Sequence, residues 1–302
     1  MTNARIAHLI MAHQQPAQLE RLIAALAHPN ADIYLHLSHN ADFSAFAHLA
    51  ALPRVYFTPR RFVVRWASFR FTEAILECTR DVLAAGRPYD FINLLSGQDY
   101  PLRPAAAVHA FLGEHRGQSF MSFEAEGSPW WQQARTRIEQ YHTTYYQFRG
   151  QYRLQTIINA VLPKRRFPLP YRLHGSSDSS WWMLSPACAA YLVRFFDEHP
   201  QLSRFGRFTW GSDEFLPATI LLNSPLRAGI INDNYRYIDW SAGGARPKVL
   251  TTVDFEQLAR SPKLFARKFD AEQDAAVLDR IDAELLGLAP AGAAAPPSVA
   301  FS

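Results

Sequence analysis

The chain has 302 residues, of which 48% are hydrophobic, with 31 Lys and Arg against 27 Asp and Glu for a net charge of +4. At roughly 100 to 200 residues per domain, this length allows one large or two small domains, and the apolar content excludes disorder as the main state. A surplus of four charges favours anionic partners only weakly and does not by itself indicate nucleic acid.

Cysteines and the amino-terminus narrow the class further. Cys78 and Cys188 are the only cysteines, too few for a disulfide framework and without the paired spacing of a zinc site, so we expect buried thiols in a reducing compartment. The first residues lack a basic stretch leading into a long apolar one, and no apolar run reaches the ~18 residues of a membrane span. We expect a cytoplasmic protein without a span, which is compatible with peripheral membrane association.

The opening of the chain predicts a strand, a helix and two more strands. Residues 5–12 form a short, mostly apolar run, and 14–29 place leucine and isoleucine at helical spacing. Residues 31–38 and the shorter 54–59 have the composition of strands. A strand, helix, strand order indicates a parallel α/β sheet.

A further helix is expected over 66–85, since Gly86 and Pro88 follow it. Residues 91–95 then predict a buried strand that runs into a turn at Ser96 and Gly97. In open α/β sheets the carboxyl ends of strands carry the ligand site, so this turn is a candidate site. A plain connecting turn explains the pattern equally well.

The second half predicts strands at 119–127 and 179–185 and helices at 186–200 and 211–224, the last with Ser212 as its N-cap. The aromatic-rich stretch from 130 to 172 lacks clean periodicity and predicts helices and loops. Strand-like segments follow at 235–240 and 262–269. The Ala/Pro-rich residues 289–302 predict a flexible tail.

The acidic pair Asp213 and Glu214 has two interpretations. Carboxylates in the first turn of a helix are stabilised by its dipole, and from the pattern alone this ordinary explanation is favoured. Glu214 also precedes the apolar Phe215 and Leu216, and desolvation by such neighbours raises the pKa of a glutamate toward that of a general base.

Two basic clusters also have alternatives. Residues 246–268 contain Arg246, Lys248, Lys263, Arg267 and Lys268, which could clamp a diphosphate or could form a solvated face. The run 163–172 mixes basic and aromatic residues, as nucleic-acid binders do, but its three prolines indicate a loop. We expect no nucleic-acid partner. No H-E-x-x-H, dinucleotide fingerprint or P-loop occurs in the chain.

Several blocks occur in one order along the chain: the stretch 7–38, Trp66-Ala67-Ser68, NLLSGQDYPL at 93–102, SSWWMLS at 179–185, SDEFLPATIL at 212–221, YRYIDW at 235–240 and LFARKFD at 264–270. Together they resemble the core-2/I-branching β-1,6-N-acetylglucosaminyltransferase and peptide O-xylosyltransferase family, glycosyltransferase family 14, over residues 5–285. The resemblance implies a single GT-A-like α/β domain over 1–288, with a mostly parallel central sheet flanked by helices.

The resemblance also implies a reaction. The family transfers a sugar with inversion from a UDP-sugar to a hydroxyl of a glycan or other acceptor, without cofactor or metal. The absence of an Asp-x-Asp metal motif among the 15 aspartates agrees with this. The family's general base falls on Glu214 and its diphosphate-binding lysine on Lys268. Its arginine falls on Arg246, with Lys248 as the near alternative.

Further positions follow from the resemblance. For the acceptor they are Glu124, Arg135, Asp99 and Trp240, although a core aromatic explains Trp240 equally well. For the donor they are His13 and Ser38.

The chain departs from the family where the second strand ends in His36-Leu37-Ser38 instead of His-x-Asp. Ser38 lacks the charge of that aspartate, so we expect nucleotide recognition to be rebuilt around Ser38, Asn40 or Asp42. This departure motivates an alternative function, a non-catalytic glycan-binding module. The chain also lacks the disulfides and the membrane anchor of animal members, which suggests a bacterial enzyme of polysaccharide biosynthesis.

Overall fold

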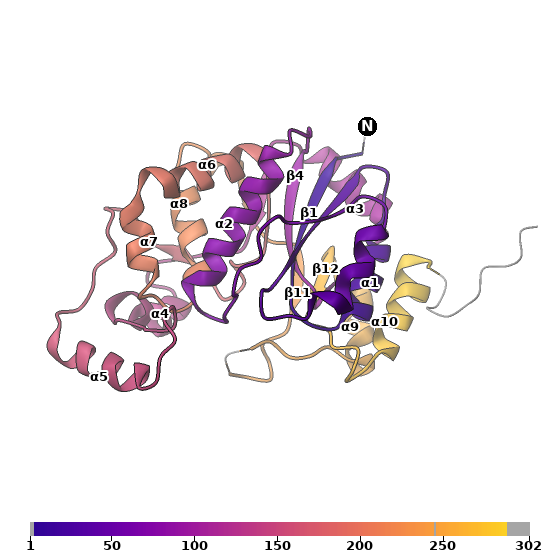
Figure 1. The fold of residues 1–302 in the computed structure, drawn as a ribbon. Helices are drawn as coiled ribbons and strands as arrows, with labels where there is room; N and C mark the ends of the chain where they lie inside the picture. The colour runs from indigo at the N-terminus through magenta and orange to yellow at the C-terminus, as the bar shows by residue number, and fades with distance from the viewer. Residues whose placement is uncertain (1–2, 245, 289–302) are drawn as a thin grey trace, which may run out of the picture. The chain divides into compact units, whose positions relative to one another are not determined.

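A seven-stranded sheet organises the protein, seen here in a computed structural model that describes residues 3–244 and 246–288 (Figure 1). The strand order is β10-β6-β9-β4-β1-β2-β3. The strands are β1 (Ile6–Ala12), β2 (Ala31–Leu37), β3 (Val55–Phe57), β4 (Phe91–Ser96), β6 (Ser119–Met121), β9 (Trp182–Leu184) and β10 (Ile230–Asn232). Only β9 pairs antiparallel with its neighbours, so the expected mostly parallel α/β sheet is confirmed.

The middle strands are buried along their whole length, as their sequences predict. Every residue of β1, β2 and β4 is buried, because helices cover both faces of a parallel sheet and no face is left for polar alternation. Backbone bonds continue this register past the strands: the Ser38 N–H donates to the Ala12 carbonyl at 2.9 Å and the Gly97 N–H to that of Met11 at 3.1 Å. The carboxyl ends of three strands therefore meet at one edge.

Helices α2 (Phe69–Ala84) and α6 (Pro186–Glu198) pack together and on the sheet, and α8 (Leu216–Leu222) packs against α6. Serine residues cap the amino ends of α2 and α6. The Ser68 hydroxyl accepts a hydrogen bond from the Arg70 N–H, and the Ser185 hydroxyl accepts one from the Cys188 N–H, both at 3.3 Å. Cys78 and Cys188 are buried and not bonded to each other, as expected. Within residues 3–244 and 246–288 no helix is long and apolar enough to cross a membrane.

The chain forms two compact units. The first contains the large sheet and comprises the residues up to Gln14, then Pro29–Gly97 and His109–Tyr235. Its other elements are α4 (Pro129–Glu139), α5 (Gln151–Val161), α7 (Pro200–Gly206), the 3-10 helices η1 (Phe43–Ala51), η2 (Ser212–Glu214) and η3 (Arg227–Gly229), and the paired strands β7 (Glu124–Ala125) and β8 (His174–Gly175).

The second unit comprises Gln15–His28, Gln98–Val108 and the described residues from Arg236 onward. It holds a sheet in the order β11-β12-β5 (Arg236–Ile238, Phe265–Arg267, Asp99–Pro101). Its helices are α1 (Pro16–Ala25), α9 (Phe255–Arg260), α10 (Ala276–Arg280), the 3-10 helix η4 (Thr252–Asp254) and the π-helix η5 (Ile281–Leu286). Helix α3 (Ala105–Glu114) has residues in both units. The expected tail, 289–302, lies outside the described residues.

One expected helix is wrong in its beginning. Residues 211–224 form the short 3-10 turn η2 followed by the separate helix α8, and Ser212 caps neither. The Ser212 hydroxyl instead bonds that of Thr72 at 2.7 Å. Gly211, with φ +63°, turns the chain, and Pro217 at the start of α8 favours a new helix because that position needs no N–H donor. Glu214 therefore does not stand in the first turn of an α-helix.

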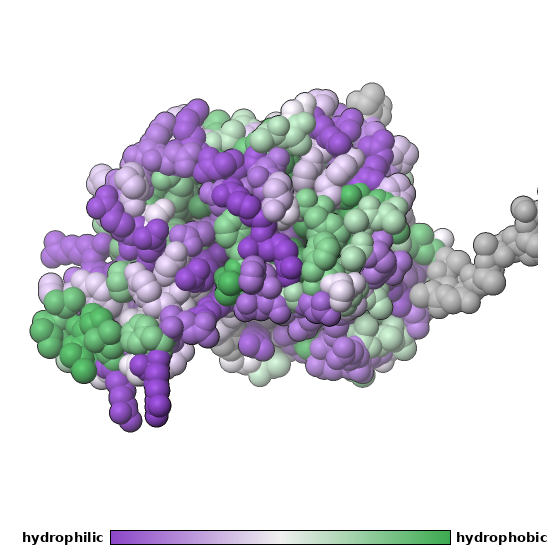
Figure 2. Space-filling view, in the orientation of Figure 1, coloured by the Kyte–Doolittle hydropathy of each residue, from purple (hydrophilic) through white to green (hydrophobic). Residues whose placement is uncertain are grey.

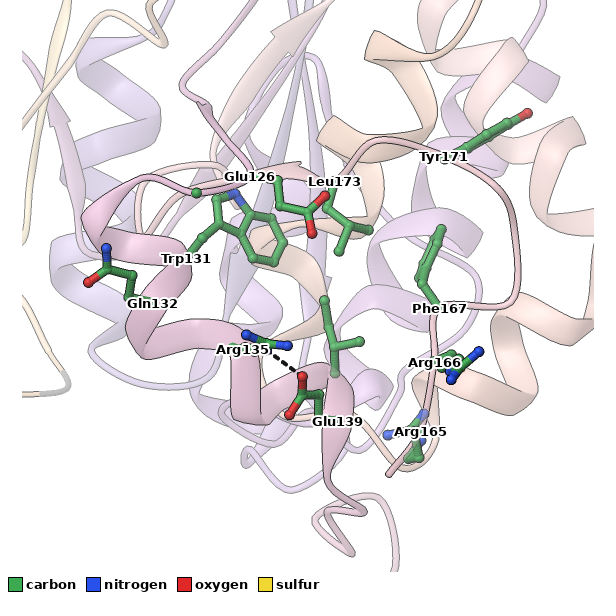
Figure 3. A pocket seen from close by; sticks show the side chains of 12 residues that line it. Glu126, Trp131, Gln132, Arg135, Glu139, Arg165, Arg166, Phe167, Tyr171 and Leu173 are labelled. Atoms are coloured by element: carbon green, nitrogen blue, oxygen red, sulfur yellow. Dashed lines mark hydrogen bonds and ion pairs between the residues drawn. The ribbon is translucent and has the colours of Figure 1, made fainter. Parts of the chain in front are cut away.

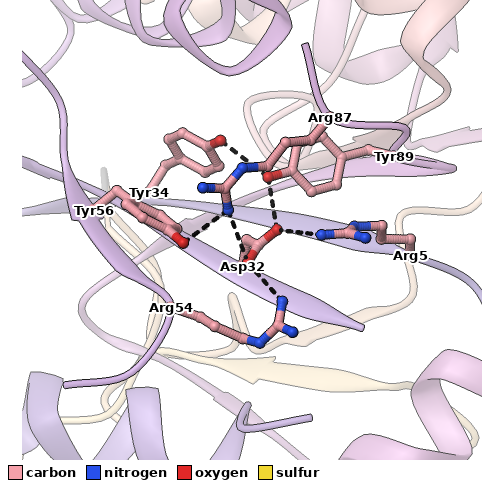
Figure 4. A network of polar contacts seen from close by, with 7 residues as sticks. All are labelled: Arg5, Asp32, Tyr34, Arg54, Tyr56, Arg87 and Tyr89. Atoms are coloured by element: carbon pink, nitrogen blue, oxygen red, sulfur yellow. Dashed lines mark hydrogen bonds and ion pairs between the residues drawn. The ribbon is translucent and has the colours of Figure 1, made fainter. Parts of the chain in front are cut away.

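A buried charge network lies near the amino end of β2, away from the strand edge that carries Ser38 (Figure 4). Asp32 is fully buried and accepts a hydrogen bond from the Tyr89 hydroxyl at 2.8 Å. Its oxygens also lie 3.1 to 3.3 Å from guanidinium nitrogens of Arg5, Arg54 and Arg87. Burial by itself raises the pKa of Asp32, but these hydrogen bonds outweigh it, so the pKa lies below its usual range.

We predict that Asp32→Asn lowers the free energy of unfolding at pH 7 by about 2 kcal/mol, since it leaves three arginines around a neutral amide. Because the pKa of Asp32 is lowered, its contribution is present above the ordinary carboxyl pKa and is lost as pH falls through the folded value. The deficit measured by urea unfolding should therefore shrink at acidic pH. Asp197→Asn removes a carboxylate that is 54% exposed and paired with Arg80, and should cost less than about 1 kcal/mol. Equal losses would contradict the role of Asp32.

Candidate active site

Glu214 is a mostly buried carboxylate with a single cationic partner. Its side chain is 17% exposed, and Oε2 accepts a hydrogen bond from Nη1 of Arg137, which is 18% exposed. Burial is the largest influence and raises the pKa of Glu214 to about 7, with Arg137 opposing the rise and Asp213 adding to it. A carboxylate of this pKa is divided between its acid and base forms at neutral pH, so it can take a proton from a bound hydroxyl.

Helix α4 presents Arg137 to Glu214. Proline at its first turn and the Ser128 hydroxyl, which accepts from the Trp131 N–H at 3.5 Å, mark its beginning. Residues two apart on an α-helix point about 200° apart, so Arg135 faces elsewhere and pairs with Glu139 instead. The resemblance implies Arg135 as an acceptor residue, which stays a prediction, and the structure adds Arg137 as the partner of the predicted base.

Tryptophan rings hold the Arg137 guanidinium in place. Its central carbon lies 4.2 Å from the ring centre of Trp210 and 5.2 Å from that of Trp130, and Trp66 meets Trp210 edge to face at 5.0 Å. Rings on the guanidinium limit its hydration and its choice of rotamer. The arginine is thus directed to Glu214, and the tryptophan rings stand beside its guanidinium.

Two glycines allow the chain to close around Glu214. A Cβ at Gly175 would lie 2.5 Å from the Glu214 carbonyl oxygen, and one at Gly211 would lie 2.9 Å from Nη1 of Arg137. The neighbouring Ser176 N–H donates to that same carbonyl at 3.1 Å. Strand β8 and the turn η2 therefore touch backbone to backbone, which positions Glu214 through its main chain.

The predicted donor residues of the first unit lie at the carboxyl edge of its sheet. His13 follows β1 and is exposed, while Ser38 follows β2 and is 4% exposed. The Arg61 side chain donates to the carbonyl oxygens of Leu37 and Ser38 at 3.2 and 2.9 Å. At the end of β2, where Ser38 replaces the family's aspartate, the guanidinium of Arg61 therefore binds the backbone carbonyls.

The predicted diphosphate residues belong to the second unit. The pKa of Lys268 is lowered, first by burial and then by the positive charge of Arg246, so the two cations lie within electrostatic reach of each other. Lys248, the near alternative, is engaged elsewhere: its ammonium lies 2.5 Å from the buried carboxylate of Asp254. Which of Arg246 and Lys248 binds the diphosphate stays a prediction.

Asp99 and Trp240 also lie in the second unit. Asp99 is fully buried, with oxygens 3.0 Å from Nε of Arg267 and 3.8 Å from that of Arg236. It is placed to hold two arginines, and its role toward an acceptor stays a prediction. Trp240 is half-buried, and its carbonyl accepts the Gly243 N–H at 3.0 Å in a tight turn.

A hollow of about 470 Å³ in the first unit is lined by Arg135 and Glu126 (Figure 3). Trp131, Phe167 and Tyr171 give it aromatic walls. Glu124, the predicted partner of Arg135, is exposed and does not line the hollow. Strand β7 ends at Ala125, and Glu126 stands in the turn that follows it, so the two glutamates do not keep the common face that residues two apart share in a strand.

The sequence analysis missed Arg137, which bonds the predicted base, and missed Trp130 and Trp210, whose rings lie against the Arg137 guanidinium. Two signals were available: the Trp pair at 130–131 opening a helix, and the Trp directly before Gly211 and Glu214. Neither reveals contact across about 80 residues of chain. In the described part of the chain, residues 3–244 and 246–288, no three His, Cys, Asp or Glu side chains are placed to hold a metal ion.

The first unit thus combines a mostly parallel α/β sheet with a desolvated carboxylate, Glu214, whose pKa is raised to about 7. The model of the Core-2/I-Branching enzyme family matches residues 6–259, and the chain belongs to this family. The expected membership in this family is thereby confirmed.

Similar proteins include xylosyltransferase 2 of Rattus norvegicus, 26% identical over 317 residues, and xylosyltransferase 2 of Homo sapiens, 27% identical over 316. Xylosyltransferase 1 of Homo sapiens is 26% identical over 315 residues. Each match covers 95% of this chain but only 31 to 34% of the relative, so the chain spans about a third of their length.

A putative glucose-1-phosphate thymidylyltransferase from Bacillus anthracis matches in structure with 11% identity, covering 84% of this chain and 94% of that chain. Its TM-score of 0.37 is too low to establish a common fold.

We predict that Glu214 titrates near pH 7 and that Arg137→Gln moves its pKa higher, because the charge and hydrogen bond of Arg137 oppose protonation. Carbon NMR of labelled glutamate carboxyls measures both values. Arg137→Lys keeps the charge and should show the smaller change. An ordinary Glu214 pKa in the unaltered chain would contradict the desolvated site.

Proposed function

We propose that this chain is an inverting, metal-independent glycosyltransferase that moves a sugar from a UDP-sugar to a hydroxyl of a glycan or similar acceptor. The observation that carries the proposal is that the Glu214 carboxylate is buried beside the Arg137 guanidinium, and this burial raises its pKa to about 7. Family membership supports glycosyl transfer as the reaction class, and xylosyltransferases are among the relatives.

The proposed step moves one proton and one electron pair. Glu214 takes the proton of the acceptor hydroxyl. At the same time, the hydroxyl oxygen attacks the anomeric carbon of the donor sugar from the face opposite the nucleotide. The bond from that carbon to the diphosphate breaks, and its electron pair leaves with UDP. Arg246 and Lys268 stabilise the growing negative charge on the leaving group, the task that a divalent ion performs in other transferases. Arg137 keeps Glu214 partly ionised despite its burial.

Other predicted contacts complete the proposal. His13 and Ser38, at the sheet edge, are assigned to the donor, and Trp240 to a sugar face. Glu124 and Arg135 remain the acceptor residues that the resemblance implies. The missing carboxylate at Ser38 favours one alternative, a glycan-binding module without turnover. Release of UDP from a panel of UDP-sugars separates the two, since a binding module releases none.

We predict that Glu214→Gln lowers kcat by roughly 10² to 10⁴, the usual contribution of a general base, while UDP-sugar affinity is retained. Because the base must be unprotonated, kcat/KM of the unaltered chain should rise with pH and level off above about 7. Glu73→Gln, which alters another carboxylate whose burial raises its pKa, is the matched control and should leave kcat unchanged. Full activity of Glu214→Gln would exclude it as the base.

We predict that Lys268→Ala weakens UDP binding roughly tenfold to a hundredfold in calorimetry, since a hydrogen bond to a charged group is worth ~1.5 to 3 kcal/mol. Lys263→Ala, five positions earlier, should bind UDP as the unaltered chain does. The same titration in EDTA should give an unchanged affinity. Loss of binding in EDTA and its return with manganese would contradict the metal-independent proposal.

A further inference from the structure

Helix α5 (Gln151–Val161) is attached to the first unit by amides. The Gln155 side-chain oxygen accepts the Thr143 N–H at 2.8 Å, and Asn159 bonds both the N–H and the carbonyl of Tyr141 at 2.8 Å. Residues four apart lie on one face of a helix, so Gln155 and Asn159 define the inner face. None of the residues of α5 is fully buried.

The opposite face of α5 is aliphatic and points into solvent. Leu154, Ile157 and Val161, at spacings of three and four, are 42%, 59% and 75% exposed. Around them lie Phe148, Tyr152 and Leu162, which are 45%, 65% and 46% exposed. Figure 2 shows hydrophobic side chains gathered where Figure 1 places α5. The apolar face of a surface helix usually packs on the core, whereas α5 is held by its amide side chains and exposes its aliphatic face. An exposed apolar face of this kind is typical of a surface that binds a partner.

The segment around this face carries charge of one sign. Residues 140–177 contain no Asp or Glu but six basic residues: Arg149, Arg153, Lys164, Arg165, Arg166 and Arg172. Lys164 pairs with Glu139 at 2.6 Å, and Arg165 donates to the Gln140 carbonyl at 3.0 Å. The other four are exposed. The partner of the aliphatic face is therefore anionic as well as apolar.

We propose that α5 and its flanks dock on a lipid bilayer with anionic headgroups. Helix α5 lies in the plane of the interface, with Ile157 and Val161 among the acyl chains and Arg149 and Arg153 at the phosphates, as basic amphipathic helices bind membranes. A second copy of this chain would bring the same positive charge to the face. A nucleic acid would satisfy the arginines but leave the aliphatic stripe in water. The proposal is independent of the reaction assigned to Glu214.

Co-sedimentation of the whole chain with phosphatidylcholine vesicles, with and without phosphatidylserine, tests this docking. We expect binding that needs phosphatidylserine and weakens with salt. Ile157→Gln combined with Val161→Gln should weaken it roughly tenfold or more by removing the inserted groups. Val253→Gln is the matched control, because Val253 is 86% exposed in a different element, and should bind as the unaltered chain does.

A charge variant separates the second contribution. Arg153→Gln should weaken vesicle binding roughly fivefold, the effect of about 1 kcal/mol per basic residue at an anionic surface. Arg260→Gln, with a side chain 83% exposed, should have no effect. Circular dichroism of each variant should match the unaltered chain, since none of these side chains is buried.

Three results would overturn the proposal. The first is no binding to phosphatidylserine vesicles. The second is an equal loss in the Val253→Gln control. The third is a dimer in analytical ultracentrifugation that the Ile157 and Val161 substitutions convert to a monomer, which would assign this face to a second copy.

Discussion

The desolvation of the Glu214 carboxylate is the constraint on which the proposed chemistry depends. In water a glutamate is ionised well below neutral pH and is a weak base. Burial raises the pKa of Glu214 to about 7, and the Arg137 guanidinium limits that rise. The surrounding features serve this balance: tryptophan rings direct the arginine, and Gly175 lets strand β8 close on the backbone of Glu214. Without burial, Glu214 would be ionised at neutral pH and too weak a base. Without Arg137, its pKa would rise further and the carboxyl group would stay protonated.

The arginines of this chain have two kinds of surroundings: some pair with buried carboxylates, and others are exposed around α5. Around Asp32 and Asp99 it neutralises buried carboxylates and holds the fold. Around α5 it stays exposed on a segment without acids, and the rest of the chain carries more acids than bases. The modest net charge of the whole protein thus hides a strongly basic surface. Only the distribution of charge, and not its sum, indicates a partner.

Membership in the Core-2/I-Branching enzyme family rests on a match across most of the chain. The relatives are about three times as long, so their full activities do not transfer as a whole. What this chain shares with them is one region, and the departure at Ser38 falls inside that region. Donor recognition is therefore where we expect it to differ from its relatives, since a hydroxyl cannot supply the charge of a carboxylate.

The sequence by itself determined the main helices and strands and the family. The mostly apolar strands β1, β2 and β4 and the helices α2 and α6 follow from the local sequence pattern, because each is formed by neighbours in the chain. Only the tertiary structure decided that Arg137 meets Glu214, that Ser212 bonds Thr72 instead of capping a helix, and that α5 turns its aliphatic face outward. Each of these depends on contacts between distant segments. Local pattern records which side chains share a face, but not what that face meets.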